Sequence, residues 1–415
     1  MTSRYLQTVQ QVVLWRLCIG CGACVSVCEN NAISLRDFPD RGIRPLVDSS
    51  KCEKCGECVK VCPGIGVEHQ ICDKKTLPEL VESWGPVLEV HVGNATDSEI
   101  RYKGSSGGIV SALALFALER QQVSKILQIG PEPEYPLQNR TVFSKNRKDI
   151  LACTGSRYSP ASPCEKFNWI RKAKDKCVFI GKPCDVAALR KAQNLDLSLD
   201  KNIVVAISIF CAGTPTTNGT NKLLDLLGIE ISQVEAIRYR GNGWPGMFTV
   251  CKKDDNESQF QLTYKQSWDD VLSKHRQLRC HLCPDSTGEL ADIACGDPWY
   301  RKGDVSEAGT SLVLVRTEKG RKFIQEAVRN GYIKLQQAES DILSLSQQSV
   351  LKRRQNLFGR LLVMRALWIP TPKFVGFCLF RNWWNLKSIE KLKSILGTFK
   401  RALIRKWLFP KKLNL

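Results

Sequence analysis

The sequence contains one cysteine pattern twice. Both copies have the spacing C-x2-C-x2-C-x3-C, and the second begins 34 residues after the first. The cysteines of the first copy are Cys18, Cys21, Cys24 and Cys28. Those of the second copy are Cys52, Cys55, Cys58 and Cys62. Two such runs are typical of a ferredoxin domain with two [4Fe-4S] clusters, in which the fourth cysteine of each run ligates the other cluster.

This rule divides the eight thiolates between two clusters. One is expected on Cys18, Cys21, Cys24 and Cys62, and the other on Cys52, Cys55, Cys58 and Cys28. Zinc takes four ligands, so two tandem quartets exceed its pattern. Pro63 follows the second run, whereas Glu29 stands at the matching place of the first, where its carboxylate should lower a cluster potential. We expect residues 1–78 to form an α+β ferredoxin-like domain that carries electrons.

Composition limits the setting of this domain. The 415 residues allow two or three domains, and 19 cysteines beside four histidines favour thiolate–iron chemistry in a reducing compartment. Residues 1–17 lack the pattern of a signal peptide, and no apolar stretch has the length of a spanning helix. We therefore expect a cytoplasmic protein, either free or attached peripherally at the inner face of the cell membrane.

The middle of the chain has the pattern of an α/β body. We divide it into residues 79–162, with a strand at Val87–Val92, and residues 163–345. In the second part, short apolar runs at Cys177–Ile180, Ile203–Phe210 and Thr310–Arg316 are each followed by a helical run. This alternation predicts parallel strands with crossover helices.

A glycine–serine loop precedes the helical run that ends at Gln121. The loop is Gly104-Ser105-Ser106-Gly107-Gly108, and Arg101 and Lys103 add positive charge beside it. Glycines allow close approach of a phosphate to the free N–H groups of a first helical turn. Simple helix capping by the same residues explains the loop equally well, and it matches no general nucleotide motif.

A second set of cysteines lies at predicted strand ends. Cys184 and Cys211 follow two of the apolar runs, and Cys280 and Cys283 form a tight pair. Because open α/β sheets place their sites at the carboxyl ends of strands, these four thiols could hold a third [4Fe-4S] cluster. A zinc ion or buried structural thiols are the alternatives. The remaining cysteines are read as structural: Cys72, Cys153, Cys164, Cys177, Cys251, Cys295 and Cys378.

Seven segments taken in order resemble the coenzyme F420 hydrogenase/dehydrogenase beta-subunit family of iron–sulfur flavoproteins. They are Gly104–Gly108, Gly155–Tyr158, Gly181–Asp185, Phe210–Gly213, Tyr239–Gly246, Arg279–Cys283 and Ala291–Trp299. The resemblance implies FAD on the α/β body and a third [4Fe-4S] cluster on Cys184, Cys211, Cys280 and Cys283. The flavin contacts that it implies are Gly104, Ser105, Ser106, Gly107, Gly108, Gly155, Ser156, Arg157, Tyr158 and Asp297. Asp297 could instead only form its turn.

The resemblance also implies a function. A ferredoxin or another low-potential donor would feed the clusters, and FAD would pass electron pairs to a coenzyme F420-like deazaflavin or an organic substrate. Family relatives include reductases of conjugated tetrapyrroles, and others are encoded with polysaccharide-building enzymes. A non-catalytic electron-transfer subunit of a hydrogenase or dehydrogenase complex is the alternative. The proton donor stays open among Tyr158, Lys182, Asp185 and His281.

The last 70 residues, 346–415, differ from the rest in charge. From Leu351 to Leu415, sixteen Lys and Arg residues stand against one acid, whereas the rest of the chain has 45 basic and 40 acidic residues. Apolar residues recur at helical intervals between Ser388 and Phe409, and we expect cations on the opposite face. The apolar residues are Ile389, Leu392, Ile395, Leu396, Phe399, Leu403 and Trp407. The pattern predicts a basic helical tail that lies on an anionic membrane or docks on protein; no nucleic-acid-binding module accompanies it.

Overall fold

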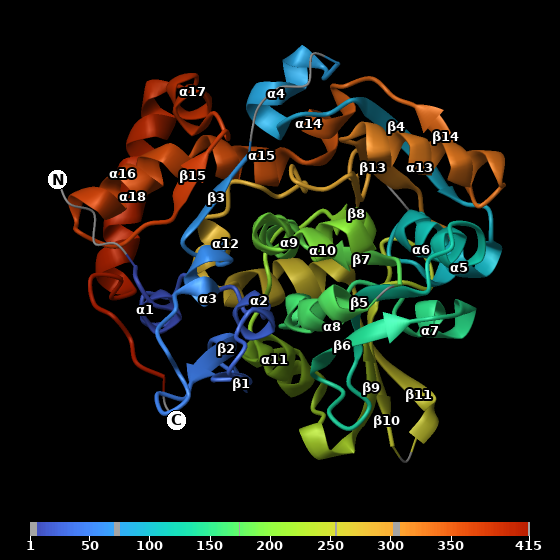
Figure 1. The fold of residues 1–415 in the computed structure, drawn as a ribbon, viewed down its shortest axis with the longest axis horizontal. Helices are drawn as coiled ribbons and strands as arrows, with labels where there is room; N and C mark the ends of the chain where they lie inside the picture. The colour runs from blue at the N-terminus through green and yellow to red at the C-terminus, as the bar shows by residue number, and fades with distance from the viewer. Residues whose placement is uncertain (1–5, 70–74, 174, 254, 302–307, 414–415) are drawn as a thin grey trace.

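The computed structural model describes residues 6–69, 75–173, 175–253, 255–301 and 308–413 (Figure 1). Cys72, predicted to be a structural thiol, lies outside these residues. None of the cysteines that the structure describes forms a disulfide.

The N-terminal domain shows the sequence repeat in its backbone. Each run opens a short helix, α2 (Ala23–Ser26) or α3 (Glu57–Lys60), whose N-cap is a left-handed glycine, Gly22 or Gly56. The other elements are α1 (Val9–Leu14), β1 (Ile33–Phe38), β2 (Gly42–Val47) and β3 (Gly66–Glu68). Because β1 and β2 form an antiparallel hairpin beside short helices, this is an α+β ferredoxin-like domain.

One mixed sheet of eight strands forms the body. In spatial order it contains β14 (Ile333–Gln337), β4 (Glu89–Ala95), β13 (Ser311–Val315), β12 (Ile293–Gly296), β8 (Ile203–Ile209), β7 (Cys177–Gly181), β5 (Lys125–Pro131) and β6 (Asn139–Ser144). Strands β12, β8, β7 and β5 are mutually parallel, and the predicted alternation accounts for two of them, β7 and β8. The prediction of a further parallel strand at Thr310–Arg316 is wrong, because β13 runs antiparallel to both neighbours. All five β13 residues are buried, and an unbroken apolar run carries no information about strand direction.

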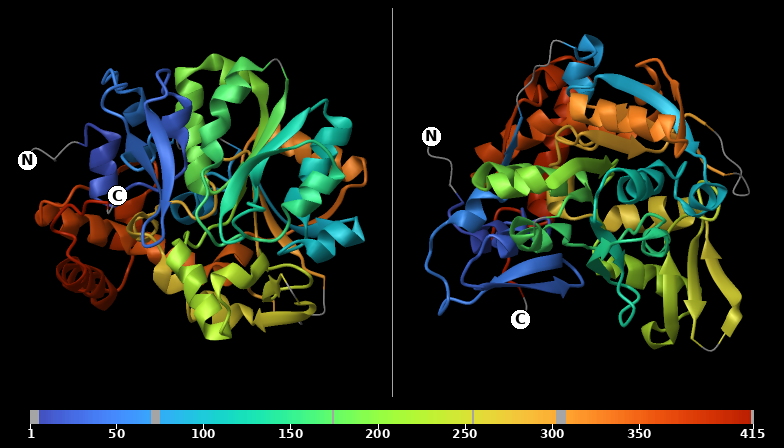
Figure 2. Two further views of the ribbon diagram at one scale, coloured as in Figure 1. Left: turned by 90° about the horizontal axis from the view of Figure 1, so that it is seen from below. Right: turned by 45° about the vertical axis from the view of Figure 1, so that its right-hand side comes forward.

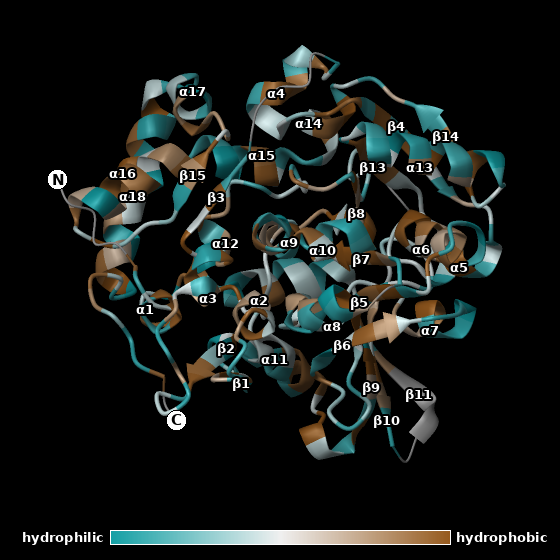
Figure 3. Cartoon of the chain, viewed as in Figure 1, coloured by the Kyte–Doolittle hydropathy of each residue, from teal (hydrophilic) through white to brown (hydrophobic). Residues whose placement is uncertain are grey.

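Helices cover both faces of this sheet, so that alternate strand residues enter different cores (Figures 1 and 2). On one face α6 (Ile109–Arg120) and α13 (Glu318–Arg329) pack over Val178 and Val205. On the other face α8 (Phe167–Lys172), α9 (Pro183–Leu195) and α10 (Leu197–Asn202) cover Phe179 and Ala206. Figure 3 shows α6 coloured mainly as hydrophobic, in agreement with its central position.

Further helices join and flank these layers. They are α4 (Pro78–Trp84), α5 (Ser98–Lys103), α7 (Arg147–Ala152), α11 (Thr217–Leu227), α12 (Leu278–His281) and α14 (Ile342–Ser346). A separate antiparallel sheet, in the order β11 (Asp255–Leu262), β10 (Phe248–Lys252) and β9 (Val234–Arg238), shares an apolar core with α11.

The C-terminal region folds back onto the N-terminal domain. Its elements are α15 (Gln348–Gln355), α16 (Leu357–Ala366), β15 (Lys373–Val375), α17 (Leu379–Trp384) and α18 (Ser388–Ile404). Strand β15 pairs in parallel with β3, and Leu361 and Met364 share a core with Val12 and Leu17. Arg16 donates hydrogen bonds to three backbone carbonyls that follow α18. Both ends of the chain therefore lie on one side of the molecule (Figures 1 and 2).

The helix expected from Ser388 to Phe409 ends at Ile404, and Trp407 is buried beyond its end. The expected opposition of apolar and cationic faces holds only in part. The face opposite the apolar residues is centred on Ser394, Thr398 and Ala402, which are buried. The tertiary contact requires small residues at these positions, a demand that hydrophobic periodicity does not reveal.

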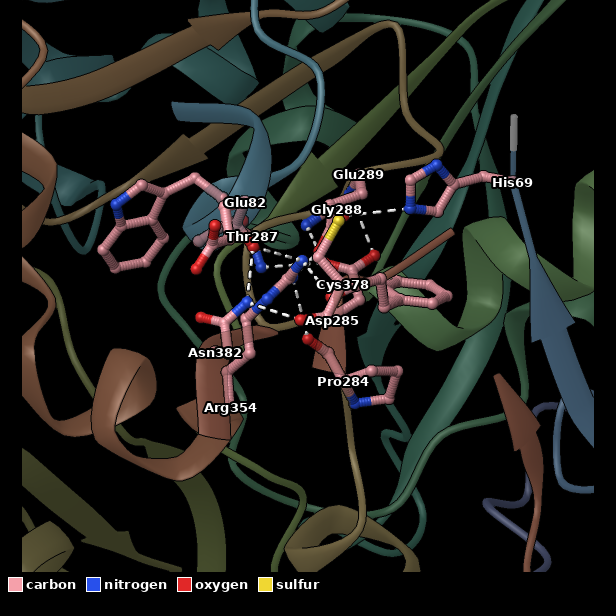
Figure 4. Close-up of polar contacts among 12 residues, drawn as sticks. His69, Glu82, Pro284, Asp285, Thr287, Gly288, Glu289, Arg354, Cys378 and Asn382 are labelled. Carbon is pink, nitrogen blue, oxygen red and sulfur yellow. Dashed lines mark hydrogen bonds and ion pairs between the residues drawn. The ribbon is translucent and has the colours of Figure 1, made fainter. Parts of the chain in front are cut away.

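A buried ionic network joins the three regions (Figure 4). Glu289 is fully buried, with His69 of the N-terminal domain 3.1 Å from one carboxylate oxygen and Arg354 of α15 bonded to the other. Arg354 also donates to the carbonyls of Pro284, Phe377 and Glu82. A single guanidinium thus links the body, α4 and two parts of the C-terminal region.

Candidate functional site

The first three cysteines of one run meet the last cysteine of the other. Burial raises the pKa of Cys62 to about 12, and the nearby thiols of Cys18 and Cys21 contribute to the rise. Burial likewise raises the pKa of Cys24, with Cys62 among its neighbours. We call Cys18, Cys21, Cys24 and Cys62 the inner quartet.

The other four cysteines of the repeat also lie together. Burial raises the pKa of Cys58, and neighbouring thiols raise it further. Those thiols are Cys55, Cys52 and Cys28. We call Cys28, Cys52, Cys55 and Cys58 the outer quartet.

The two quartets have different surroundings. A Cβ added to Gly22, in the inner loop, would lie 2.9 Å from the backbone nitrogen of Glu165 in the body, whereas one added to Gly56 would meet nothing within 4 Å. Cys21 is buried and Cys55 is exposed. The inner quartet therefore packs against the body, and the outer quartet faces solvent.

A third quartet forms where three segments of the body meet. Cys184 lies in the first turn of α9, Cys211 follows β8, and Cys280 belongs to α12, close to Cys283. Burial raises the pKa of Cys211 to about 12, with Cys280 and Cys283 among the thiols that add to it. Burial also raises the pKa of Cys184, and Cys211 and Cys283 again contribute. All four thiols thus gather at the carboxyl ends of parallel strands.

The sulfur atoms also accept hydrogen bonds from the backbone. Gly20 N donates to Cys18 Sγ (3.4 Å), Ala32 N to Cys28 Sγ (3.3 Å) and Thr214 N to Cys280 Sγ (3.4 Å). N–H···S bonds of this kind stabilise thiolates and tune the potentials of iron–sulfur clusters. Within the described ranges, no group of three or more His, Cys, Asp or Glu side chains closes around a single metal ion.

Cys164 connects the inner quartet with the third quartet. Its backbone nitrogen donates to Cys21 O (2.9 Å), and its thiol donates to the carbonyl of Asp185, next to Cys184 (3.5 Å). A hydrogen bond from Cys164 lowers the pKa of Cys21. Cys164, predicted to be a structural thiol, thus lies between two groups of candidate ligands.

A cavity of about 650 Å³ opens beside the third quartet, with Cys211 and Lys182 in its wall. It is lined by all but one of the predicted flavin contacts: Gly104, Ser105, Ser106, Gly108, Gly155, Ser156, Arg157, Tyr158 and Asp297. Gly107 lies outside the lining, where its nitrogen donates to Ser311 Oγ and a Cβ would lie 2.6 Å from the Gly93 carbonyl oxygen. Glycine is needed at position 107 because a side chain there would clash with the neighbouring backbone.

The glycine–serine loop leaves the N-terminus of α6 open toward this cavity. Gly108 is the N-cap in a left-handed conformation (φ 75°), and no side chain caps the helix. Gly108, Ile109, Val110 and Ser111 all line the cavity. Uncapped N–H groups at a helix N-terminus favour an anion such as a phosphate.

Arg240 lines the cavity but is not among the predicted flavin contacts. Its two terminal nitrogens each donate to Asp297 at 2.8 Å, and Trp244 Nε1 donates to Asp297 at the same distance. Both carboxylate oxygens are thus engaged by the chain itself, and Asp297 holds Arg240 in the wall. The motif Tyr239–Gly246 contained the signal for Arg240, but only folding brought it to Asp297.

An aromatic wall lies next to this pair. Arg240 stacks over Tyr264 (5.1 Å) and Trp299 (5.3 Å), and Trp268 packs against Tyr158 at 4.6 Å between ring centroids. Tyr264 and Trp268 lie outside the motifs used above, so no sequence signal pointed to them.

Three of the four candidate proton donors line the cavity, namely Tyr158, Lys182 and Asp185. Lys182 Nζ donates to Asp185 Oδ2 at 2.7 Å. Burial raises the pKa of Tyr158. His281 is absent from the lining, and burial together with nearby arginines lowers its pKa to about 3.

A ferredoxin-like domain that packs its inner quartet against a mixed α/β body defines an iron–sulfur redox protein. Family models agree with this class: a 4Fe-4S dicluster domain matches residues 17–64. Models of the coenzyme F420 hydrogenase/dehydrogenase beta subunit match residues 90–167 with its N-terminal part and 174–341 with its C terminus. The chain belongs to the coenzyme F420 hydrogenase/dehydrogenase beta-subunit family.

Individual relatives agree with this assignment. The chain is 26% identical over 287 residues to a coenzyme F420 hydrogenase subunit beta of Methanococcus voltae, covering 67% of this chain and 95% of that protein. It is 24% identical to a coenzyme F420-dependent sulfite reductase of Methanocaldococcus jannaschii, over 85% of this chain and 53% of that protein. A chain of the F420-reducing [NiFe] hydrogenase complex from Methanosarcina barkeri shares the fold, with a TM-score of 0.52, 24% identity, and coverage of 67% of this chain and 94% of that chain.

Proposed function

We propose that this protein is an iron–sulfur flavoprotein oxidoreductase. Electrons from a ferredoxin or another low-potential donor would enter at the outer quartet and pass through the inner and third quartets to FAD. A two-electron acceptor, either a coenzyme F420-like deazaflavin or an organic substrate, would receive them. The names of the relatives support the deazaflavin, and a substrate of polysaccharide-related metabolism stays within the proposal.

One observation carries this proposal: the cavity has the glycine–serine loop in one part of its wall and Cys211 in another. A flavin held there would lie beside the third quartet. The cavity volume of about 650 Å³ falls within the ~300–1,000 Å³ that is usual for ligand pockets. The open N-terminus of α6 suits a pyrophosphate, and the aromatic wall suits a planar ring system.

The order of the quartets in space supports the sequence of carriers in the relay, whichever way the electrons flow. The outer quartet faces solvent, where a protein donor can reach it, and the inner quartet contacts the body through Cys164. When bound, FAD would take up electrons singly and release them in pairs, which converts cluster chemistry into two-electron chemistry. The chain's own residues would hold the cofactor phosphates at Gly104–Gly108 and exclude water with Tyr264, Trp268 and Trp299.

Anaerobic reconstitution tests the cofactor content. We expect about twelve irons and twelve sulfides per chain, with one FAD. The double variant Cys184→Ser, Cys211→Ser should retain about eight irons, whereas Cys177→Ser, a buried strand thiol outside the quartets, should match the wild type. Eight irons in the wild type would refute the third cluster, and an absence of bound flavin would refute the flavoprotein assignment.

The alternative is an electron-transfer subunit without a substrate site of its own. It is favoured by the relatives that are named as hydrogenase subunits. Turnover by the purified chain alone separates the two functions. Reduced ferredoxin or dithionite should drive reduction of F420, NAD(P)+ or a tetrapyrrole acceptor by the enzyme, whereas a subunit should need its complex.

A further inference from the structure

Helix α18 docks on the protein through its small residues and leaves its apolar residues outside. Ser394, Thr398 and Ala402 are at most 4% exposed. Ser394 Oγ accepts a hydrogen bond from Trp383 Nε1 (3.0 Å) and lies close to Gly359 of α16. These contacts fix which side of the helix faces inward.

The outward side is a continuous apolar strip. Its residues follow one another at intervals of three and four and are 46–60% exposed: Ile389, Leu392, Leu396, Phe399 and Leu403. Phe380 and Trp384 of α17 are 50% and 61% exposed. Lys391 of α18 stacks over Trp384 at 4.7 Å, so α17 packs against the same helix. We call the five apolar side chains of α18 the outer apolar strip.

Exposed cations lie along one edge of the strip and at the ends of α18. Helical geometry places Lys393 and Lys400 along one edge, next to Leu396. Further exposed cations are Lys387, Arg401, Arg405 and Lys406. Across the part of the chain that the structure describes, the cations of α18 make no ion pair with an acidic side chain. The one acid of the helix, Glu390, lies 4.0 Å from Lys352 of α15.

We propose that the outer apolar strip binds an anionic lipid surface. Amphipathic helices with Leu, Phe and Trp on one side and Lys and Arg beside them lie in the headgroup region of anionic membranes. Protein–protein interfaces are depleted in Lys, whereas this surface is rich in it. A second copy of the chain would bring two strongly cationic surfaces together, which like-charge repulsion opposes.

The strip has the dimensions of a surface helix. With 17 residues, α18 is about 25 Å long, enough for several apolar side chains to enter one leaflet. None of the described helices has the length and hydropathy to span a bilayer. The protein would therefore lie on the membrane with α18 parallel to the surface.

Co-sedimentation of the full-length holoprotein with vesicles tests the proposal. The vesicles contain phosphatidylcholine alone or with one third phosphatidylglycerol. We expect the wild type to sediment with the anionic vesicles at low salt, to be released at high salt, and to stay in solution with phosphatidylcholine alone. The variant Leu396→Glu, Phe399→Glu should bind the anionic vesicles at least about tenfold more weakly, because it loses two apolar side chains that would insert into the lipid.

Leu226→Glu is the matched control, since Leu226 on α11 is 57% exposed and lies outside the strip. It should bind as the wild type does, and an unchanged iron content should show that both variants are folded. The proposal is overturned if the wild type remains in the supernatant or if the strip variant binds as well as the control. It is also overturned if light scattering shows that the wild type is a dimer and the strip variant is a monomer. That result would identify a second copy of the chain as the partner that covers the strip.

Discussion

Replacement of Arg354 by methionine tests whether the buried network holds the C-terminal region on the body. The Arg354 side chain is 6% exposed, and its guanidinium donates to Glu289 and to the carbonyls of Glu82, Pro284 and Phe377. Methionine fills much of the same volume but donates no hydrogen bond. The variant therefore leaves the Glu289 carboxylate buried with fewer partners.

The expected cost follows from this geometry. Removal of one partner from a buried ion pair destabilises a protein by about 3–5 kcal/mol. Burial alone would raise the pKa of Glu289, but Arg354 and His69 beside it bring the pKa below its ordinary value. In the wild type, Glu289 thus stabilises the fold at pH values above the pKa that it has in the unfolded chain. This contribution is lost as the pH falls.

The variant should reverse that dependence. Without Arg354, burial would raise the pKa of Glu289, so its contribution to stability would be lost as the pH rises. The difference in stability between wild type and Arg354→Met should therefore be largest near pH 7.5 and smaller near pH 5.5.

Anaerobic urea unfolding at both pH values, followed by tryptophan fluorescence and cluster absorbance, measures the difference. Lys352→Met is the control, because Lys352 lies on the same helix and its side chain is 71% exposed. The control should stay within about 0.5 kcal/mol of the wild type. If Arg354→Met behaves like the control, or if its cost grows as the pH falls, the account of the network is refuted.

Three further predictions concern the sites. Gly155→Ala should lower the FAD content, because a Cβ there would lie 2.6 Å from Arg240 O. The control Gly228→Ala, also at positive φ but with nothing within 4 Å, should retain FAD, and equal FAD content in the two variants would contradict this reasoning. Brief exposure to air should remove the cluster of the solvent-facing outer quartet first, so that iron is lost in two phases; loss in a single phase would count against the assigned surroundings. Glu29→Gln should raise a cluster potential in a redox titration, because it removes the negative charge of an exposed carboxylate next to Cys28. An unchanged potential would show that solvent screens this charge.

Local patterns predicted several elements well. The helical runs after the glycine–serine loop and after Cys177–Ile180 appear as α6 and α9, and the apolar runs at Cys177–Ile180 and Ile203–Phe210 appear as β7 and β8. Strand direction at β13 could not be read, because a strand buried on both faces has the same apolar run in either direction. The partner of Asp297 was equally inaccessible, since Arg240 lies 57 residues away in sequence.

The two cysteine runs were readable from the sequence alone because three of the four ligands expected for each cluster are close together in sequence, where the backbone largely determines their geometry. The third quartet was only suggested, since its thiols come from three separate segments and meet only where the sheet and α12 pack together. The orientation of α18 was decided by tertiary structure as well. Its periodicity indicated an amphipathic helix, but the close approach of α16 selected the small residues as the inner face and left the apolar strip outside. Sequence determines which groups are available, whereas packing between distant segments determines which of them meet.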